Sequence, residues 1–219
     1  MKGAAQTIPT LLEHGADDAP ALSTPGGKPL TYRALRAHVA RTIDALASQG
    51  IGPGDRVAIV LDNGPEMASA FLSVGAGATA APLNPNYRAD EFEFYLTDLR
   101  AKLLVVAKDK DSPCVEVAQR LQVPTARLAP HPEQGAGTFS LEFAKGQPTA
   151  NRQPPATQPS DTALVLHTSG TTSRPKIVPL SHANVCASAL NVSASLALTA
   201  ADRGLVIMPL FHIHGLIAA

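Results

Sequence analysis

Residues 164–182 read LVLHTSGTTSRPKIVPLSH, and this stretch points both to the fold and to the chemistry. The apolar run over residues 162–166 predicts a buried strand, and residues 177–180 predict another. A polar turn, residues 167–176, lies between them, and its last nine residues hold five hydroxyl side chains, one glycine and two cations. Short hydroxylated residues let backbone N–H groups approach an anion and add O–H donors. The stretch therefore predicts a loop that binds a polyanion such as a chain of phosphates.

The polar residues of this loop and its glycine are the candidate phosphate ligands: Thr168, Ser169, Gly170, Thr171, Thr172, Ser173, Arg174 and Lys176. Lys176 can supply a positive charge, and charge-assisted hydrogen bonds are the strong class. The loop is no Walker P-loop, because that pattern ends in Gly-Lys-Ser/Thr and this one reads Pro175-Lys176-Ile177. A Walker-type kinase or GTPase is therefore disfavoured. The alternative interpretation is a solvated turn between two strands, with Arg174 only a surface cation.

Working outward, helices and strands alternate along the first part of the chain. The first predicted helix runs from a cap at Thr31 to about Gln49, with a stop at Gly50, and the second runs from Pro65 to a break at Gly75 and Gly77. Two more helices are predicted over residues 90–99 and 113–121. The predicted strands are residues 57–61, 78–83 and 102–107. Apolar strands between amphipathic helices are typical of a mainly parallel sheet with helices on both faces. The expected fold class is therefore α/β.

The second part of the chain begins with an irregular, proline-rich connection over about residues 124–160, with a short strand around 139–143. After the hydroxyl-rich loop, Ser181 is the expected cap of a helix to about Leu198, and residues 205–208 predict a last strand.

The composition of the chain excludes several classes of function. Lys and Arg total 18 and so do Asp and Glu, so the net charge is zero, and aromatic residues make up 4%. A chain without excess cations or stacking surfaces is a poor nucleic-acid binder. Two cysteines are too few for a disulfide framework, and the sequence shows neither a secretory signal nor a membrane-spanning run, so a cytoplasmic protein is expected.

The loop resembles the phosphate-binding loop of the adenylate-forming superfamily, which includes AMP-forming acyl-CoA synthetases, luciferases and adenylation domains. The resemblance covers residues 8–219 and extends to Leu30-Thr31-Tyr32, to residues 50–59, to residues 75–85 and to Met208-Pro209-Leu210-Phe211-His212-Ile213-His214-Gly215. Ser173-Arg174 resembles most the oxalate–CoA ligase branch. The resemblance implies that residues 1–219 are the N-terminal portion of the AMP-binding large domain, in which helix and sheet layers alternate (αβαβα), with the rest of that domain and a small C-terminal domain lying further along.

The implied reaction is a two-step ligation. A carboxylic acid attacks ATP to give an acyl-adenylate and pyrophosphate, and a thiol, usually coenzyme A, then takes the acyl group. The resemblance gives Lys176 a catalytic role, places His212 at the acyl-adenylate pocket, and has Mg²⁺ bound through the ATP phosphates rather than by protein ligands. The fragment alone is expected to be inactive, and a peroxisomal address further along the chain stays open.

Two alternative functions and two departures from the family pattern remain. The enzyme could instead load a carrier protein or release acyl-AMP, or the chain could be a non-catalytic phosphate-binding module. Ser173 and Ile177 both stand where the family usually has glycine, and Ile177 is the more awkward change. A β-branched residue disfavours a positive φ, so either the chain runs extended through Ile177 or the loop is impaired.

Overall fold

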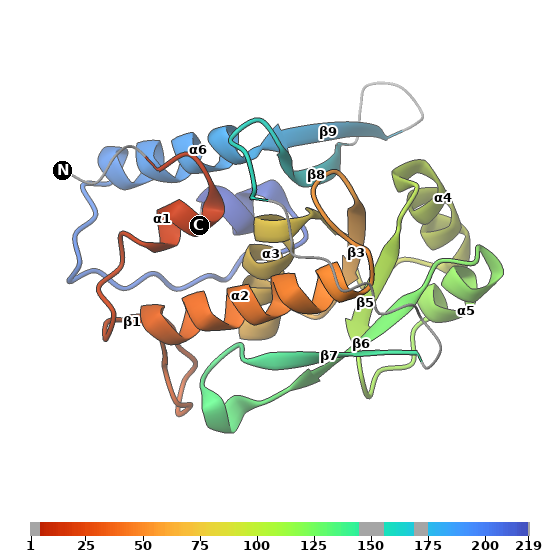
Figure 1. Ribbon diagram of the computed structural model, residues 1–219, viewed down its shortest axis with the longest axis horizontal. Helices are drawn as coiled ribbons and strands as arrows, with labels where there is room; N and C mark the ends of the chain where they lie inside the picture. The colour runs from red at the N-terminus through yellow and green to blue at the C-terminus, as the bar shows by residue number, and fades with distance from the viewer. Residues whose placement is uncertain (1–4, 145–155, 169–174, 219) are drawn as a thin grey trace.

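The computed structural model describes residues 5–144, 156–168 and 175–218, and a seven-stranded sheet forms its centre (Figure 1). The strands lie in the order β7-β6-β5-β3-β4-β8-β9. Their bounds are β3 Arg56–Val60, β4 Thr79–Pro82, β5 Leu103–Ala107, β6 Thr125–Pro130, β7 Phe139–Phe143, β8 Thr162–Thr168 and β9 Lys176–Ser181. The inner pairs are parallel, and only the two edge strands, β7 and β9, pair antiparallel. The α/β class expected from the sequence is confirmed.

Helices cover both faces of this sheet, because strands with apolar residues on both faces must be shielded from water on both. The helices are α1 Ile8–Leu12, α2 Tyr32–Ser48, α3 Pro65–Gly77, α4 Ala89–Leu99, α5 Pro113–Arg120 and α6 His182–Ser195, with a 3₁₀ turn η1 Pro132–Gln134 and a π-helical turn η2 His214–Ala218. Alternate residues of β3 show the two faces. Val57 and Ile59 join a core with α1, α2 and α3, whereas Ala58 and Val60 join a second core with α4 and α5.

Local signals in the sequence place three of the helix ends as expected, at Thr31, Gly50 and Ser181. The Thr31 hydroxyl accepts from the Ala34 N–H at 3.3 Å and caps α2, which ends just before Gly50, whose φ is +75°. The Ser181 hydroxyl likewise accepts from the Asn184 N–H at 3.2 Å and caps α6.

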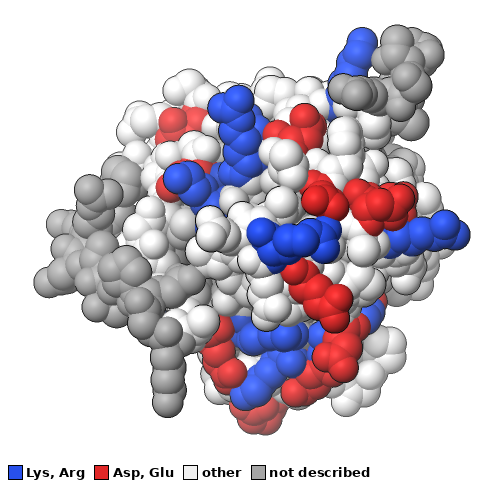
Figure 2. Space-filling view, turned by 90° about the vertical axis from the view of Figure 1, so that its right-hand side faces the viewer, with Lys and Arg blue, Asp and Glu red and all other residues white. Residues whose placement is uncertain are grey.

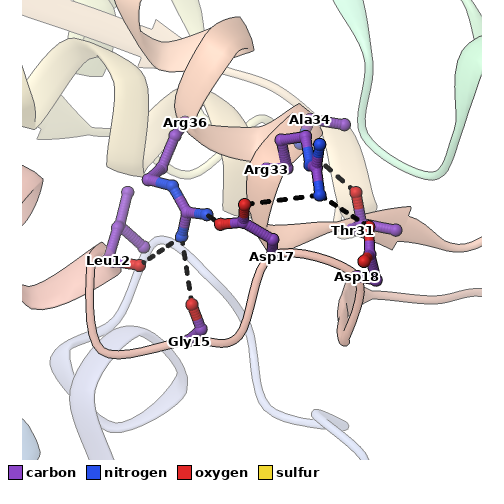
Figure 3. Close-up of polar contacts among 8 residues, drawn as sticks. All are labelled: Leu12, Gly15, Asp17, Asp18, Thr31, Arg33, Ala34 and Arg36. Carbon is purple, nitrogen blue, oxygen red and sulfur yellow. Dashed lines mark hydrogen bonds and ion pairs between the residues drawn. The ribbon is translucent and has the colours of Figure 1, made fainter.

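The N-terminal segment is fixed to α2 by arginine side chains (Figure 3). Arg36 donates to the carbonyls of Leu12 and Gly15 at 2.9 and 3.2 Å and also bonds Asp17. This segment leads from α1 to a small antiparallel ribbon, β1 Pro20–Leu22 with β2 Leu30–Thr31. Neither α1 nor the ribbon was expected, because runs of five, three and two residues are too short for a periodic signal.

The strand predicted at residues 205–208 is wrong. This segment has no regular structure, and the side chains of Leu205 and Ile207 are 82% and 76% exposed. A strand needs a neighbour to pair its N–H and C=O groups, and in the described part of the chain none lies beside this segment.

The prediction of an irregular connection over residues 124–160 is wrong at its start, where β6 runs from Thr125 to Pro130. Pro124 precedes β6 and Pro130 is its last residue, so the N–H groups between them remain free to pair with β5 and β7. The short strand predicted around 139–143 is confirmed as β7, and residues 145–155 lie outside the described part.

One predicted helix end and one predicted break need correction. Helix α6 ends at Ser195 rather than near Leu198. Helix α3 continues through Gly75, where a break was predicted, and ends at Gly77 as predicted. Both glycines let the helix lie close to its neighbours. A Cβ on Gly75 would lie 3.2 Å from the Ala163 carbonyl oxygen, and one on Gly77 would lie 2.8 Å from Ile43. None of the helices in the described part combines the length and hydrophobicity that crossing a bilayer requires.

Candidate phosphate-binding hairpin

The two ends of the hydroxyl-rich loop are the last residue of β8 and the first of β9. These strands form an antiparallel hairpin in which Thr168 pairs with Lys176 and His167 pairs with Ile177. Both Thr168 and Lys176 have exposed side chains. The structure therefore brings these two predicted ligands together at the open end of the hairpin. The other predicted ligands, Ser169 to Arg174, lie outside the described residues.

The hairpin enters the sheet beside a parallel strand. Ala80 of β4 pairs with Leu164 of β8, so the carboxyl end of β8 lies at the same edge as the carboxyl ends of β3, β4 and β5. Ligands of open α/β sheets bind at this edge, because the loops that follow the strands gather there. The two ends of the loop, Thr168 and Lys176, therefore lie at the edge where ligands of such sheets usually bind.

The backbone at Ile177 is extended, which is the first of the two possibilities raised by a β-branched residue at this position. Ile177 lies within β9 and packs against the core that α4 and α5 form. Since an extended strand suits a β-branched residue, Ile177 costs the hairpin no strain.

His167 was predicted in the polar turn, but it belongs to β8, and its side chain is only 6% exposed. Its Nε2 lies 3.0 Å from Asp98 Oδ2 on α4, and its ring meets the Tyr95 ring edge to face at 4.7 Å. Burial lowers the pKa of His167, although Asp98 acts in the opposite direction. Sequence reasoning missed this pair because its members are 69 residues apart.

His212 lies on a separate segment, before the η2 turn. Its side chain is exposed, and its ring lies 5.1 Å from that of Phe211. Among the described contacts, no hydrogen bond or ion pair joins His212 to Thr168 or Lys176. The role predicted for it at an acyl pocket therefore stays a prediction.

Asn63 holds the segment that leads to His212. Its side-chain amide donates to the Met208 carbonyl at 3.2 Å and accepts from the Leu210 N–H at 2.8 Å. Leu210 is buried, so this clamp ends the exposed stretch before it. Sequence reasoning missed this role of Asn63, since a contact across 147 residues leaves no local signal.

The surface around α4 and α5 carries charges of both signs (Figure 2). Arg120 of α5, for example, pairs with Glu93 of α4 at 2.7 Å. A hollow of about 530 Å³ beside the end of α4 is lined mainly by charged side chains, including Arg56, Arg100 and Asp98, and none of Thr168, Lys176 and His212 lines it. This hollow therefore does not contain the described phosphate-ligand candidates, although Asp98, which lines it, also contacts His167 of β8. Within the described residues, no three His, Cys, Asp or Glu side chains gather as metal ligands would.

The fold and the hairpin define a class. Residues 12–219 match the family of AMP-binding enzymes, and the chain belongs to that family.

Its curated relatives include acid–thiol ligases. The chain is 41% identical over 220 residues to an oxalate–CoA ligase of Arabidopsis thaliana, and the match covers 97% of the chain and 42% of that relative. It is 33% identical over 184 residues to an acyl-CoA synthetase of Gibberella moniliformis, covering 78% of the chain and 33% of the relative. Among solved structures, ATP-bound MatB from Rhodopseudomonas palustris has a TM-score of 0.75 at 27% identity, covering 97% of the chain and 42% of MatB. The matches to the Arabidopsis ligase and to MatB thus include nearly the whole chain, which spans about two fifths of the length of each of these relatives.

Proposed function

We propose that the protein containing this chain is an AMP-forming acid–CoA ligase. The observation that carries the proposal is the β8–β9 hairpin, whose exposed ends, Thr168 and Lys176, frame a loop of hydroxyl side chains at the carboxyl edge of a parallel sheet. The naming of its relatives as CoA ligases supports the same reaction.

The proposed first step forms an acyl-adenylate. An oxygen of the carboxylate attacks the α-phosphorus of ATP, the bond between the α-phosphorus and the bridging oxygen breaks, and pyrophosphate leaves with that electron pair. In the second step the sulfur of coenzyme A attacks the acyl carbon, its proton passes to solvent, and AMP leaves. The chain contributes mainly to the first step, where charge builds on the leaving pyrophosphate.

Lys176 is the residue we propose to neutralise that charge. Its ammonium is exposed at the start of β9, and Thr168 lies opposite it and offers a hydroxyl. Ser169, Gly170, Thr171, Thr172, Ser173 and Arg174 complete the proposed set of phosphate ligands. Backbone N–H groups and short hydroxyls suit the non-bridging oxygens of phosphates, and a lysine acts on them as a point charge.

Mg²⁺ fits this arrangement as a companion of ATP. The described residues offer no cluster of carboxylate or imidazole ligands, whereas a phosphate chain supplies oxygens that Mg²⁺ prefers. When bound, the ion would neutralise part of the phosphate charge. Thr168 and Lys176 then have to orient the phosphates rather than hold the metal.

We propose a small carboxylic acid as the substrate, with oxalate the first candidate. The oxalate–CoA ligases of Arabidopsis thaliana and Saccharomyces cerevisiae are 41% and 39% identical to this chain over the parts that match. The proposed acyl-pocket residue is His212, whose imidazole can donate a hydrogen bond to a carboxylate.

A product assay tests the proposal. The full-length protein is incubated with ATP, Mg²⁺, coenzyme A and a panel of small acids that includes oxalate, and nucleotides and thioesters are identified by mass spectrometry. The expected products are AMP, pyrophosphate and an acyl-CoA. Acyl-AMP without a thioester would indicate an adenylation enzyme with another acceptor, and the absence of any acid-dependent AMP would contradict the proposal.

A further inference from the structure

The base of the β8–β9 hairpin is attached to helix α4, which lies far from it in the sequence. His167 is the residue before Thr168, and Asp98 of α4 is the partner of its Nε2 at 3.0 Å. The carboxylate can only accept, so Nε2 carries the proton. The ring is further enclosed by Tyr95 at 4.7 Å and Phe94 at 6.4 Å, both from α4.

A second side chain seats the hairpin on the same face of the sheet. Paired residues of neighbouring strands point to the same face, and Ile177 is paired with His167. Ile177 packs against the core that includes Val165, two residues before His167 on β8. The first residue pair inside the open end is therefore held from both strands, His167 by a hydrogen bond and Ile177 by apolar contact.

The arrangement has consequences for the loop. Thr168 and Lys176 form the next residue pair, and their side chains are exposed. Since the open end of an antiparallel strand pair frays easily when its side chains reach into solvent, the partly buried pair behind it sets how firmly the two ends are held together. Burial lowers the pKa of His167, and a neutral imidazole still offers the Nε2–H that Asp98 accepts.

We propose that His167, held by Asp98, is a positioning residue that fixes the base of the hairpin on α4 and so presents Thr168 and Lys176 to nucleotide phosphates in one orientation. The inference rests on the proposed function for its role in catalysis. It assigns to Asp98 and His167 an effect on nucleotide binding rather than contact with the nucleotide.

Matched variants of α4 test the proposal. Asp98→Ala removes the partner of His167, and Glu93→Ala removes another carboxylate of the same helix, which pairs with Arg120 at 2.7 Å instead. Each variant breaks one ion pair or hydrogen bond of α4, and only the first reaches the hairpin. His167→Leu removes the donor, whereas His167→Gln places an amide N–H near the position of Nε2.

Two measurements are made on the full-length protein: the KM for ATP in acid-dependent ATP–pyrophosphate exchange, and amide hydrogen exchange of β8 and β9 without substrates. Asp98→Ala and His167→Leu are expected to raise the KM for ATP about tenfold, a typical loss for a misplaced charge-assisted contact, with a smaller change in kcat. They are also expected to speed amide exchange at the open end of the hairpin. Glu93→Ala should match the wild type, and His167→Gln should recover most of the loss.

The outcomes separate this inference from the proposed function. A wild-type protein without acid-dependent exchange of pyrophosphate would contradict the function, and the amide data would still decide whether Asp98 and His167 hold the hairpin. An active wild type with Asp98→Ala indistinguishable from Glu93→Ala would overturn the inference. Faster amide exchange with an unchanged KM for ATP would overturn it as well, because His167 would then support the fold without positioning the loop.

Discussion

His38 makes the stability of this fold depend on pH. Its ring on α2 is 1% exposed, lies 4.4 Å from the Phe139 ring in edge-to-face contact, and among the described residues neither ring nitrogen has a hydrogen-bond partner. Burial, with smaller effects of Arg41 and His131, lowers its pKa to about 4 from an ordinary value of 6.5. Between these two values the unfolded chain binds a proton that the folded chain does not.

The sign and size of the effect follow from this difference. Stability is fully present above pH 6.5 and is lost as pH falls toward 4, because protonation then favours the unfolded chain. One pKa unit corresponds to about 1.4 kcal/mol, so the free energy of unfolding should fall by about 2 kcal/mol between pH 8 and pH 5 through His38 alone.

His38→Leu removes both the titrating group and the unpartnered nitrogens. We expect the variant to lose this part of the pH dependence, so that relative to the wild type it gains about 2 kcal/mol on going from pH 8 to pH 5. The assay is urea unfolding followed by circular dichroism across this range. His14→Leu is the control, because His14 is exposed. The reasoning is refuted if His38→Leu and His14→Leu show the same slope with pH as the wild type.

Asn63 and Gly137 carry two further predictions, the second with Gly26 as its control. Asn63→Ala leaves the N–H of Leu210 without its 2.8 Å partner, so the KM for the acid should rise several-fold while the KM for ATP stays unchanged. Pyrophosphate exchange measured against acid concentration tests this. Equal changes in both KM values would contradict it. Gly137→Ala should lower the free energy of unfolding by roughly 3 kcal/mol, because φ is +79° and a Cβ would lie 2.6 Å from the Pro65 carbonyl oxygen. Gly26→Ala, with φ +70° and open space, should cost only about 1 kcal/mol in the same urea assay, and equal losses would argue against the clash.

The regular part of the fold could be predicted because its signals are local. The Thr31 cap and Gly50 mark the ends of α2, and the apolar runs of β3 and β5 are long enough to be recognised as buried strands. The two strands that flank the loop were predicted for the same reason, since two short apolar runs flank a polar turn, whereas their antiparallel pairing was not predicted. The resemblance to adenylate-forming enzymes added the role of the loop, which local patterns alone leave open.

The remaining features depend on contacts between distant residues. Strand β6 exists because β5 and β7 flank it, although prolines stand at its two ends. Residues 205–208 have the sequence of a strand, but no strand in the described part of the chain pairs with them. The bond from His167 to Asp98 joins two segments that only the packing of α4 on the sheet brings together.

Pyrophosphate exchange by Lys176→Ala tests the account most directly. The acid-dependent exchange rate of the full-length variant should be lower than that of the wild type by about 1–3 kcal/mol in transition-state stabilisation, roughly 5- to 150-fold, with the unfolding free energy unchanged. Lys28→Ala removes an exposed lysine away from the hairpin and should leave the rate intact. A wild-type rate in Lys176→Ala would contradict the claim that this hairpin holds the phosphates of ATP.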